Sequence, residues 1–190
     1  MYDLHSILIQ LKKEDTPLHG VMVRCVRCFY QWLDPTLWEG SALFELWAQE
    51  LELIYGDLRQ RLSPNAKTDA GSLGDRFGFD TPPELPRLLQ SIQTFYSVLI
   101  KLIAWDTLQG ASPEPPLTEL LSGRAFVNRG IRNFCGDDWY IWPLDIWDPA
   151  LETQCEELRA CLEAFDTCPE GSTLSLDSLC LLYTSDAADD

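Results

Sequence analysis

The sequence predicts an all-α fold, a multi-helix domain with one long loop at about residues 63–80 and no sheet. Apolar residues recur every three or four positions through most of the chain, which is the spacing of one face of an α-helix. No run alternates apolar and polar residues over more than a few positions, so no strand is expected. Hydrophobic residues make up 46% of the 190, a share typical of a chain that folds around a core.

The first third of the chain predicts three consecutive helices. A short amphipathic helix covers about residues 4–11. Thr16-Pro17 ends it and begins a second helix that continues to Trp32, since proline is tolerated in a first turn. Asp34-Pro35 then begins a third helix, whose pattern is the most regular in the chain. Its apolar residues are Leu37, Phe44, Trp47, Leu51, Ile54 and Leu58.

The rest of the chain predicts a loop, a long helix and a compact aromatic region. Residues 63–80 are rich in Ser, Pro, Asn, Asp and Gly, which indicates a surface loop. The helix that follows, from Leu85 to about Ile103, is apolar around much of its circumference and is therefore expected to be central and buried. After a break near residues 110–116, an aromatic region spans 117–147. Asp148-Pro149 then caps a final helix with Leu151, Cys155, Leu158, Leu162 and Phe165 on one side.

Charge and composition narrow the functional classes. The chain has 14 basic and 30 acidic residues, and a surface with a formal charge of −16 repels the phosphate backbone of DNA at long range. Its start resembles no signal peptide, and no stretch approaches the roughly 20 apolar residues of a membrane span. Its seven scattered cysteines do not resemble the disulfide framework of a small secreted domain. We therefore expect a cytoplasmic chain with reduced thiols and no membrane association.

The segment 180–190 resembles translated adapter sequence rather than native protein. Its residues can be encoded, in one reading frame, by TGTCTCTTATACACATCT followed by GACGCTGCCGACGA. This DNA looks like the transposon end and adapter of a sequencing library. Three acidic residues lie in this segment, so the formal charge of residues 1–179 is −13. We therefore expect residues 1–179 to form a helical N-terminal domain, the front piece of a longer protein.

Cys25-Val26-Arg27-Cys28 is the one C-x-x-C pair in the sequence. A structural zinc site needs four ligands, and neither a second pair nor a suitably spaced histidine is present, because His5 and His19 have no partner spacing. A thioredoxin-like motif follows a strand, whereas this pair lies within a helical pattern. The pattern favours buried, unreactive thiols, and no metal-binding residue is assigned.

Two further segments resemble known motifs only superficially. The glycines at 71, 74 and 78 match neither the G-x-G-x-x-G nor the Walker spacing, so they are interpreted as part of a surface loop. Thr81-Pro82-Pro83-Glu84 resembles the Asn-Pro-Pro-aromatic motif of amino-methyltransferases. Thr81 and Glu84, however, supply neither the amide that holds the target amine nor the aromatic ring that stacks on the flipped base. This segment is therefore interpreted as a helix start.

Asp137-Asp138 lies beside Trp139, Tyr140 and Trp142, downstream of Arg124, Arg129 and Arg132. Paired carboxylates perform acid–base or metal chemistry only with a convergent set of partners, such as the Asp…Glu-x-Lys of metal-dependent nucleases, and that spacing does not occur here. We expect a helix cap with ion pairs to the nearby arginines, and an aromatic cluster that belongs to the core or to a domain interface. No catalytic or cofactor-binding residue is predicted anywhere in the chain.

Four stretches, in order, resemble a known family. Residues 47–57 (WAQELELIYGD) resemble a W…L…I/V-Y-G helix end, and residues 94–104 (TFYSVLIKLIA) resemble H-T-Y-L…L-A-K-L-I-A. Residues 121–134 and 138–145 resemble L-x-G-x-x-F…G-I-x-N-F…D-F-F-S-W-x-L-D. This set is similar to the helical region before the catalytic domain of large adenine-specific DNA methyltransferases from bacterial restriction-modification and phage-defence systems. Gln93, Phe95 and Pro143 depart from the family pattern.

The resemblance implies a parent enzyme that transfers a methyl group from S-adenosylmethionine to the exocyclic amine of a flipped adenine. The cofactor motif and the catalytic motif would both lie downstream, so this fragment would hold no cofactor. Its partners would be the methylase domain of the same chain and, through the full-length protein, DNA. The alternative is a non-enzymatic helical protein-interaction module, which accounts equally well for an aromatic-rich sequence without catalytic motifs.

Overall fold

The computed structural model describes residues 4–34, 44–50, 53, 70–108, 114–135 and 138–163. Within these ranges every regular element is a helix, which confirms the all-α prediction. In chain order the elements are α1 (Leu4–Lys12), α2 (Pro17–Trp32), α4 (Ala70–Arg76), α5 (Leu85–Leu108), α6 (Leu117–Leu121), α7 (Arg124–Val127), α8 (Asp138–Ile141), the 3₁₀ turn η1 (Trp142–Leu144) and α9 (Pro149–Glu163).

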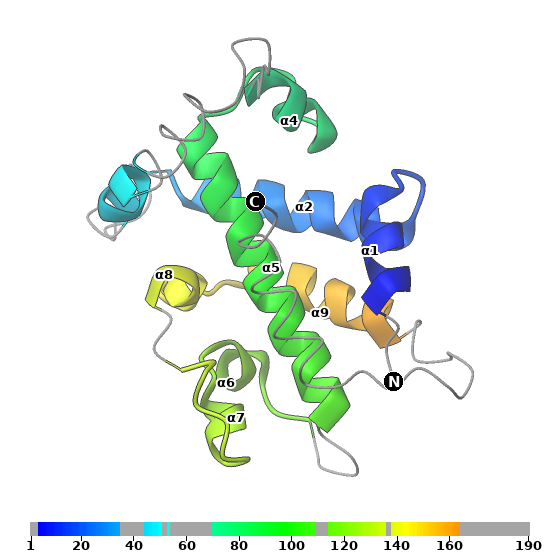
Figure 1. The fold of residues 1–190 in the computed structure, drawn as a ribbon, viewed down its shortest axis with the longest axis vertical. Coiled ribbons are helices and arrows are strands. Elements are labelled where there is room, and N and C mark those ends of the chain that lie inside the picture. The colour runs from blue at the N-terminus through cyan, green and yellow to red at the C-terminus, as the bar shows by residue number, and fades with distance from the viewer. Residues whose placement is uncertain are drawn as a thin grey trace.

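The long helix α5 runs diagonally through the molecule, and the other helices are arranged around it (Figure 1). Helices α2, α5 and α9 pack against one another and form the core, α1 packs on α2, and α6 and α8 pack on α5. Burying these apolar faces supplies the main stabilisation of the fold. The fully buried side chains of the three central helices include Leu18, Phe29, Leu88, Phe95, Leu102, Leu151 and Leu158.

Specific polar contacts define the ends of the central helices. The Thr16 hydroxyl accepts a hydrogen bond from the His19 amide at 3.2 Å, so the predicted start of α2 at Thr16-Pro17 is confirmed. The Asp148 carboxylate accepts one from the Leu151 amide at 2.7 Å and begins α9 as predicted. At the other end of α2, the Arg87 guanidinium of α5 donates to the Tyr30 carbonyl at 2.6 Å. A cationic donor at a helix C-terminus satisfies carbonyls that have no partner within the helix.

The expectation that no stretch approaches the length and apolarity of a membrane span was wrong for α5. By length and hydropathy alone, this helix is long and apolar enough to cross a bilayer. However, 72% of its most apolar window is buried inside the structure, so the apolar surface is used for packing between helices. This burial confirms the prediction that the helix after Glu84 is central.

The predicted loop at residues 63–80 is wrong for its second half, because residues 70–76 form α4. Gly78 has a φ of +67° and ends this helix in a Schellman motif, in which the Phe79 amide donates to the Gly74 carbonyl at 3.1 Å. Gly74 also allows close packing, since a Cβ atom there would lie 2.5 Å from Pro83 Cδ. These glycines therefore end and pack a short helix, while residues 63–69 lie outside the described residues.

The third predicted helix is described only in part. Residues 44–50 and 53 are helical, and the remainder of the predicted range lies outside the described residues. Phe44 and Trp47 are buried, and their rings stack with centroids 6.1 Å apart. The predicted apolar face of this segment is thus confirmed at the two positions for which burial is described.

Gly123 and Gly130 share a backbone conformation but differ in the space around them, so substitutions there separate two contributions to stability. Both have a φ of +79°, but a Cβ atom at Gly123 would lie 2.2 Å from the Phe134 carbonyl oxygen, whereas one at Gly130 would meet nothing within 4 Å. We predict that Gly130→Ala costs only the left-handed backbone penalty, about 1–2 kcal/mol. Gly123→Ala should cost roughly 1–3 kcal/mol more, because the backbone must also shift. Urea unfolding of both variants measures the difference, and equal losses would contradict the close approach at Gly123.

Candidate functional site

Aromatic side chains of α8 and η1 bind two polar side chains of α5. The buried indole of Trp142 donates a hydrogen bond from Nε1 to the Thr94 hydroxyl at 3.0 Å, and its ring meets Phe29 edge-on with centroids 5.8 Å apart. One residue earlier on α5, Gln93 Oε1 accepts from the Tyr140 hydroxyl at 2.7 Å. Trp142 is therefore a core residue, as expected for the aromatic cluster.

Lys101 is a buried cation two turns further along α5. Only 3% of the residue is exposed, and its Nζ donates to the Leu121 carbonyl at the end of α6 at 2.7 Å. The ammonium thus satisfies a helix-terminal carbonyl that water does not reach. This role of Lys101 could not be predicted from sequence, because its neighbours in α5 form an apolar pattern that predicts burial without indicating a polar partner.

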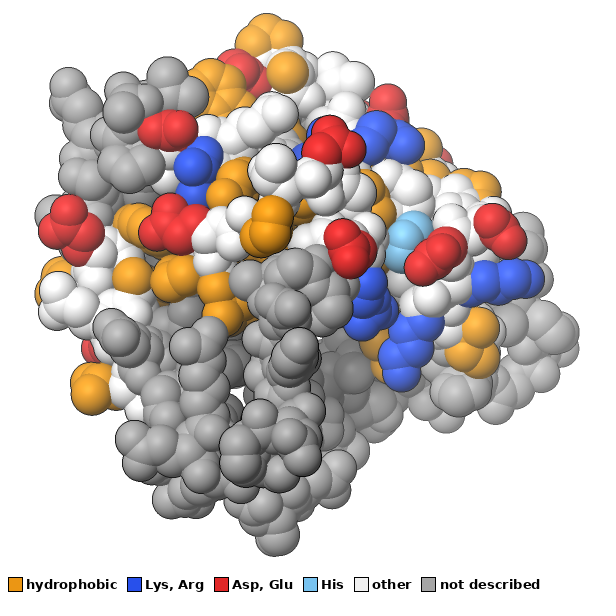
Figure 2. Space-filling view, turned by 90° about the horizontal axis from the view of Figure 1, so that it is seen from above, with side chains coloured by type: hydrophobic (Ala, Val, Ile, Leu, Met, Phe, Trp, Pro, Cys, Tyr) orange, Lys and Arg blue, Asp and Glu red, His pale blue; other side chains and the backbone are white. Residues whose placement is uncertain are grey.

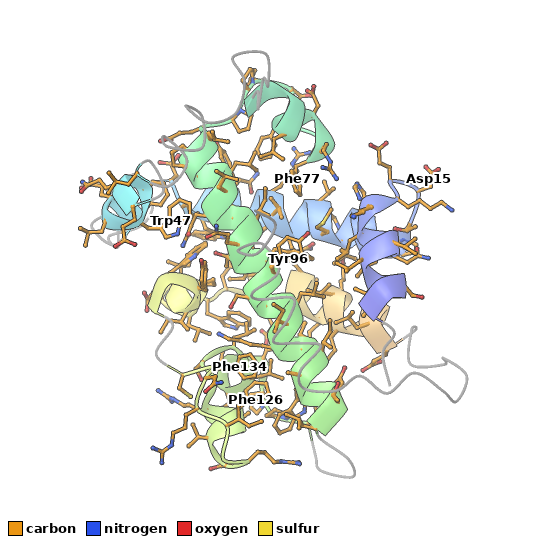
Figure 3. The ribbon with its side chains drawn as sticks, viewed as in Figure 1. Asp15, Trp47, Phe77, Tyr96, Phe126 and Phe134 are labelled. Atoms are coloured by element: carbon orange, nitrogen blue, oxygen red, sulfur yellow. The ribbon has the colours of Figure 1, made fainter. Side chains whose placement is uncertain are left out.

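Residues 123–135 form a compact turn at the C-terminal end of α5, which we call the α7 corner. Phe126 and Phe134 point toward one another there (Figure 3), with ring centroids 4.5 Å apart. Gly130 ends α7 in a second Schellman motif, in which the Ile131 amide donates to the Phe126 carbonyl at 3.1 Å and the Gly130 amide to the Val127 carbonyl at 2.9 Å. The ring packing and the hydrogen bonds hold both ends of the turn in place.

The arginines of the α7 corner are exposed rather than buried. Arg129 donates to the Leu108 carbonyl at 2.6 Å and lies over the Trp105 ring, 5.4 Å from its centroid. No described residue forms an ion pair with Arg124 or Arg132. Asp137 and the side chain of Asp138 lie outside what the structure describes, so the predicted ion pairs to these carboxylates stay a prediction.

The C-x-x-C pair lies within α2, where this helix packs against α9. Cys25 is buried, and its Sγ donates to the Gln154 carbonyl at 3.7 Å, while Cys28 is only half-buried. Burial raises the pKa of Cys25 well above its ordinary value, and the nearby Cys155 and Cys28 raise it further. Burial likewise raises the pKa of Cys155 to about 12. These thiols carry little thiolate at neutral pH, which disfavours nucleophilic reactivity.

Among the described residues, no group of three or more His, Cys, Asp or Glu side chains is placed to hold a metal ion. The same ranges contain no strand. The chain matches no family model, no curated protein and no solved structure. Among the described residues, the α7 corner and its attachment to α5 have the best-defined geometry, and they form the candidate site.

Because Cys25 and Cys155 are buried, we expect the folded protein to lose stability at alkaline pH. Because the folded pKa of Cys25 and of Cys155 lies above the unfolded value of 9.0, the unfolded chain releases these protons first as pH rises. Their stabilising contribution is present below about pH 9 and is lost between about pH 9 and pH 12. The double variant Cys25→Ala/Cys155→Ala should lose less stability than the wild type between pH 8 and pH 10.5, as measured by urea unfolding. Parallel losses in both proteins would contradict this assignment.

The Trp142–Thr94 contact predicts a second effect on stability. Thr94→Val removes the acceptor of a buried indole N–H and should cost about 1–3 kcal/mol in urea unfolding. Thr94→Ser keeps the hydroxyl and should lose about 1 kcal/mol or less. Thr153→Val, on the exposed face of α9, is the matched control and should change stability by less than about 0.5 kcal/mol. If the valine and serine variants at position 94 were equally stable, the hydrogen bond would contribute nothing.

Proposed function

We propose that this chain is the helical N-terminal accessory domain of an S-adenosylmethionine-dependent, adenine-specific DNA methyltransferase of a restriction-modification or phage-defence system. The proposal rests on the ordered resemblance of residues 47–57, 94–104, 121–134 and 138–145 to that family. Methyl transfer itself is assigned to a downstream domain, because the cofactor and catalytic motifs of the family would lie after the resembling stretches.

One observation supports the proposal most directly: the resembling stretches contact one another. Thr94 of the second stretch accepts the hydrogen bond from Trp142 of the fourth. Lys101 of the second stretch donates to the Leu121 carbonyl of the third at 2.7 Å. The second, third and fourth stretches thus belong to one packed unit, as the stretches of a shared domain would.

A domain of this kind would support and position the DNA during the reaction. An enzyme that flips a base must hold the duplex on both sides of the target while the base leaves the stack. A rigid helical body next to the catalytic domain extends the surface that positions DNA, and its own residues take no part in proton or methyl transfer. The role assigned to this chain is therefore support and positioning.

Two exposed leucines favour a second candidate, a helical protein-interaction module. Leu46 is 56% exposed and Leu53 is 76% exposed. Exposed apolar side chains are typical of surfaces where another helix packs. In a methyltransferase, these side chains would face a neighbouring domain.

Recovery of the gene beyond the codon of Leu179 tests the proposal. We expect the frame to continue into a glycine-rich strand turn and an Asn-Pro-Pro-aromatic motif, since these are the parts that bind the cofactor and the flipped adenine. Long-read sequencing of the source DNA gives the answer directly. A stop codon soon after Leu179 would contradict the methyltransferase assignment and favour the interaction module.

A further inference from the structure

We propose that the open side of α5 is the docking surface for a segment of the same chain, residues 174–179, which follow α9. This surface, which we call the α5 stripe, consists of five apolar side chains at helical spacing: Leu85, Leu89, Ile92, Tyr96 and Ile100. The inference concerns contacts within this chain and does not depend on the proposed function.

The α5 stripe is the part of the central helix that the described helices leave open. Tyr96, labelled in Figure 3, is 39% exposed, and the other four side chains are half-buried. Because residues three or four positions apart share one face of a helix, the five lie in one line. From Leu88 to Trp105, every residue outside the stripe except Gln93 is buried. Figure 1 shows α5 in front of α2 and α9, which pack on its other side.

The stripe carries no charge, unlike the rest of the surface. No charged residue occurs between Arg87 and Lys101, although the chain has 30 acidic and 14 basic residues. On the face shown in Figure 2, by contrast, Lys/Arg and Asp/Glu side chains lie close together. A helix that is hydrophobic all round is normally covered all round. The α5 stripe therefore indicates an apolar partner.

The size of the stripe favours a partner from the same chain over a separate protein. Stable interfaces between chains bury at least about 1,000 Å² in total. Five side chains of which none is more than 39% exposed supply only a fraction of that area. A second copy would also carry the same formal charge of −16 and be repelled. A tethered segment needs less area, because its link holds it at an effective concentration of about millimolar.

Residues 174–179 (LSLDSL) meet these requirements. They contain three leucines and a single charged residue, Asp177. Helix α9 packs on α5 and ends at Glu163, and ten residues link it to Leu174. An extended chain of ten residues spans about 33 Å, whereas the α5 stripe is about 22 Å long. The link is therefore longer than the whole stripe, and the segment covers the open side of the core.

Photo-cross-linking from position 96 tests the proposal. Tyr96 of the 190-residue chain is replaced with p-benzoylphenylalanine, whose ketone reacts with nearby C–H bonds on illumination, and the adduct is mapped by mass spectrometry. We expect an intramolecular adduct to residues 174–179, with a yield that does not change with protein concentration. The proposal is overturned by adducts only between two copies, by adducts only to other segments, or by no adduct at all.

Matched leucine variants show whether apolar burial holds the segment in place. In the cross-linking chain, Leu174→Ser/Leu176→Ser should lower the yield of the adduct on the order of ten-fold, because each leucine lost from a buried contact weakens docking several-fold. The control Leu181→Ser/Leu182→Ser makes the same change in the predicted adapter segment. It should keep the yield within about two-fold of the unsubstituted chain. Equal losses in the two variants, or no loss in the first, would contradict docking by residues 174–179.

Discussion

Burial of α5 on nearly all sides is the constraint on which the rest of the structure depends. A helix in the centre of a bundle must either be wholly apolar or find a partner for each polar side chain that it carries inward. Two buried polar side chains of this helix find partners outside it. Thr94 accepts from the Trp142 indole and Lys101 donates to the Leu121 carbonyl, so both fix a segment that follows α5 in the chain. The aromatic region is thereby attached to the bundle at defined points.

Two kinds of local structure define the ends of the helices: side-chain caps and glycines. Side chains define the ends of α2 and α9: Thr16 and Asp148 cap the first turns, and Arg87 binds a carbonyl at the last turn of α2. Glycines define the ends of α4 and α7, because both helices end in Schellman motifs that need a left-handed residue. Short helices gain little from their own hydrogen bonds, so such ends decide whether they form at all.

The sequence was sufficient for the elements with a long and regular apolar pattern. Helices α1, α2 and α9 were predicted with their starts, because periodicity and capping residues act locally. The apolar pattern also placed the start of α5 at Leu85, but the interpretation of Thr81-Pro82-Pro83-Glu84 as the helix start was wrong, since residues 81–84 are not helical. Helix α4 was missed, since seven residues with two glycines resemble a loop until the packing against Pro83 is known. The attachment of the aromatic region was also beyond prediction. It depends on which polar side chains of α5 meet Trp142 and Tyr140 across nearly 50 positions of sequence.

The contrast between the two glycines of the α7 corner has a consequence for its evolution. The base is closed at Gly123, where no side chain can be added without moving the backbone, whereas the tip at Gly130 opens onto empty space. A side chain added at the tip meets no neighbour, so substitutions there leave the packing of Phe126 and Phe134 intact. Related chains can be expected to share the base and to diverge at the tip. Such a division lets one scaffold acquire new surface chemistry without a new fold.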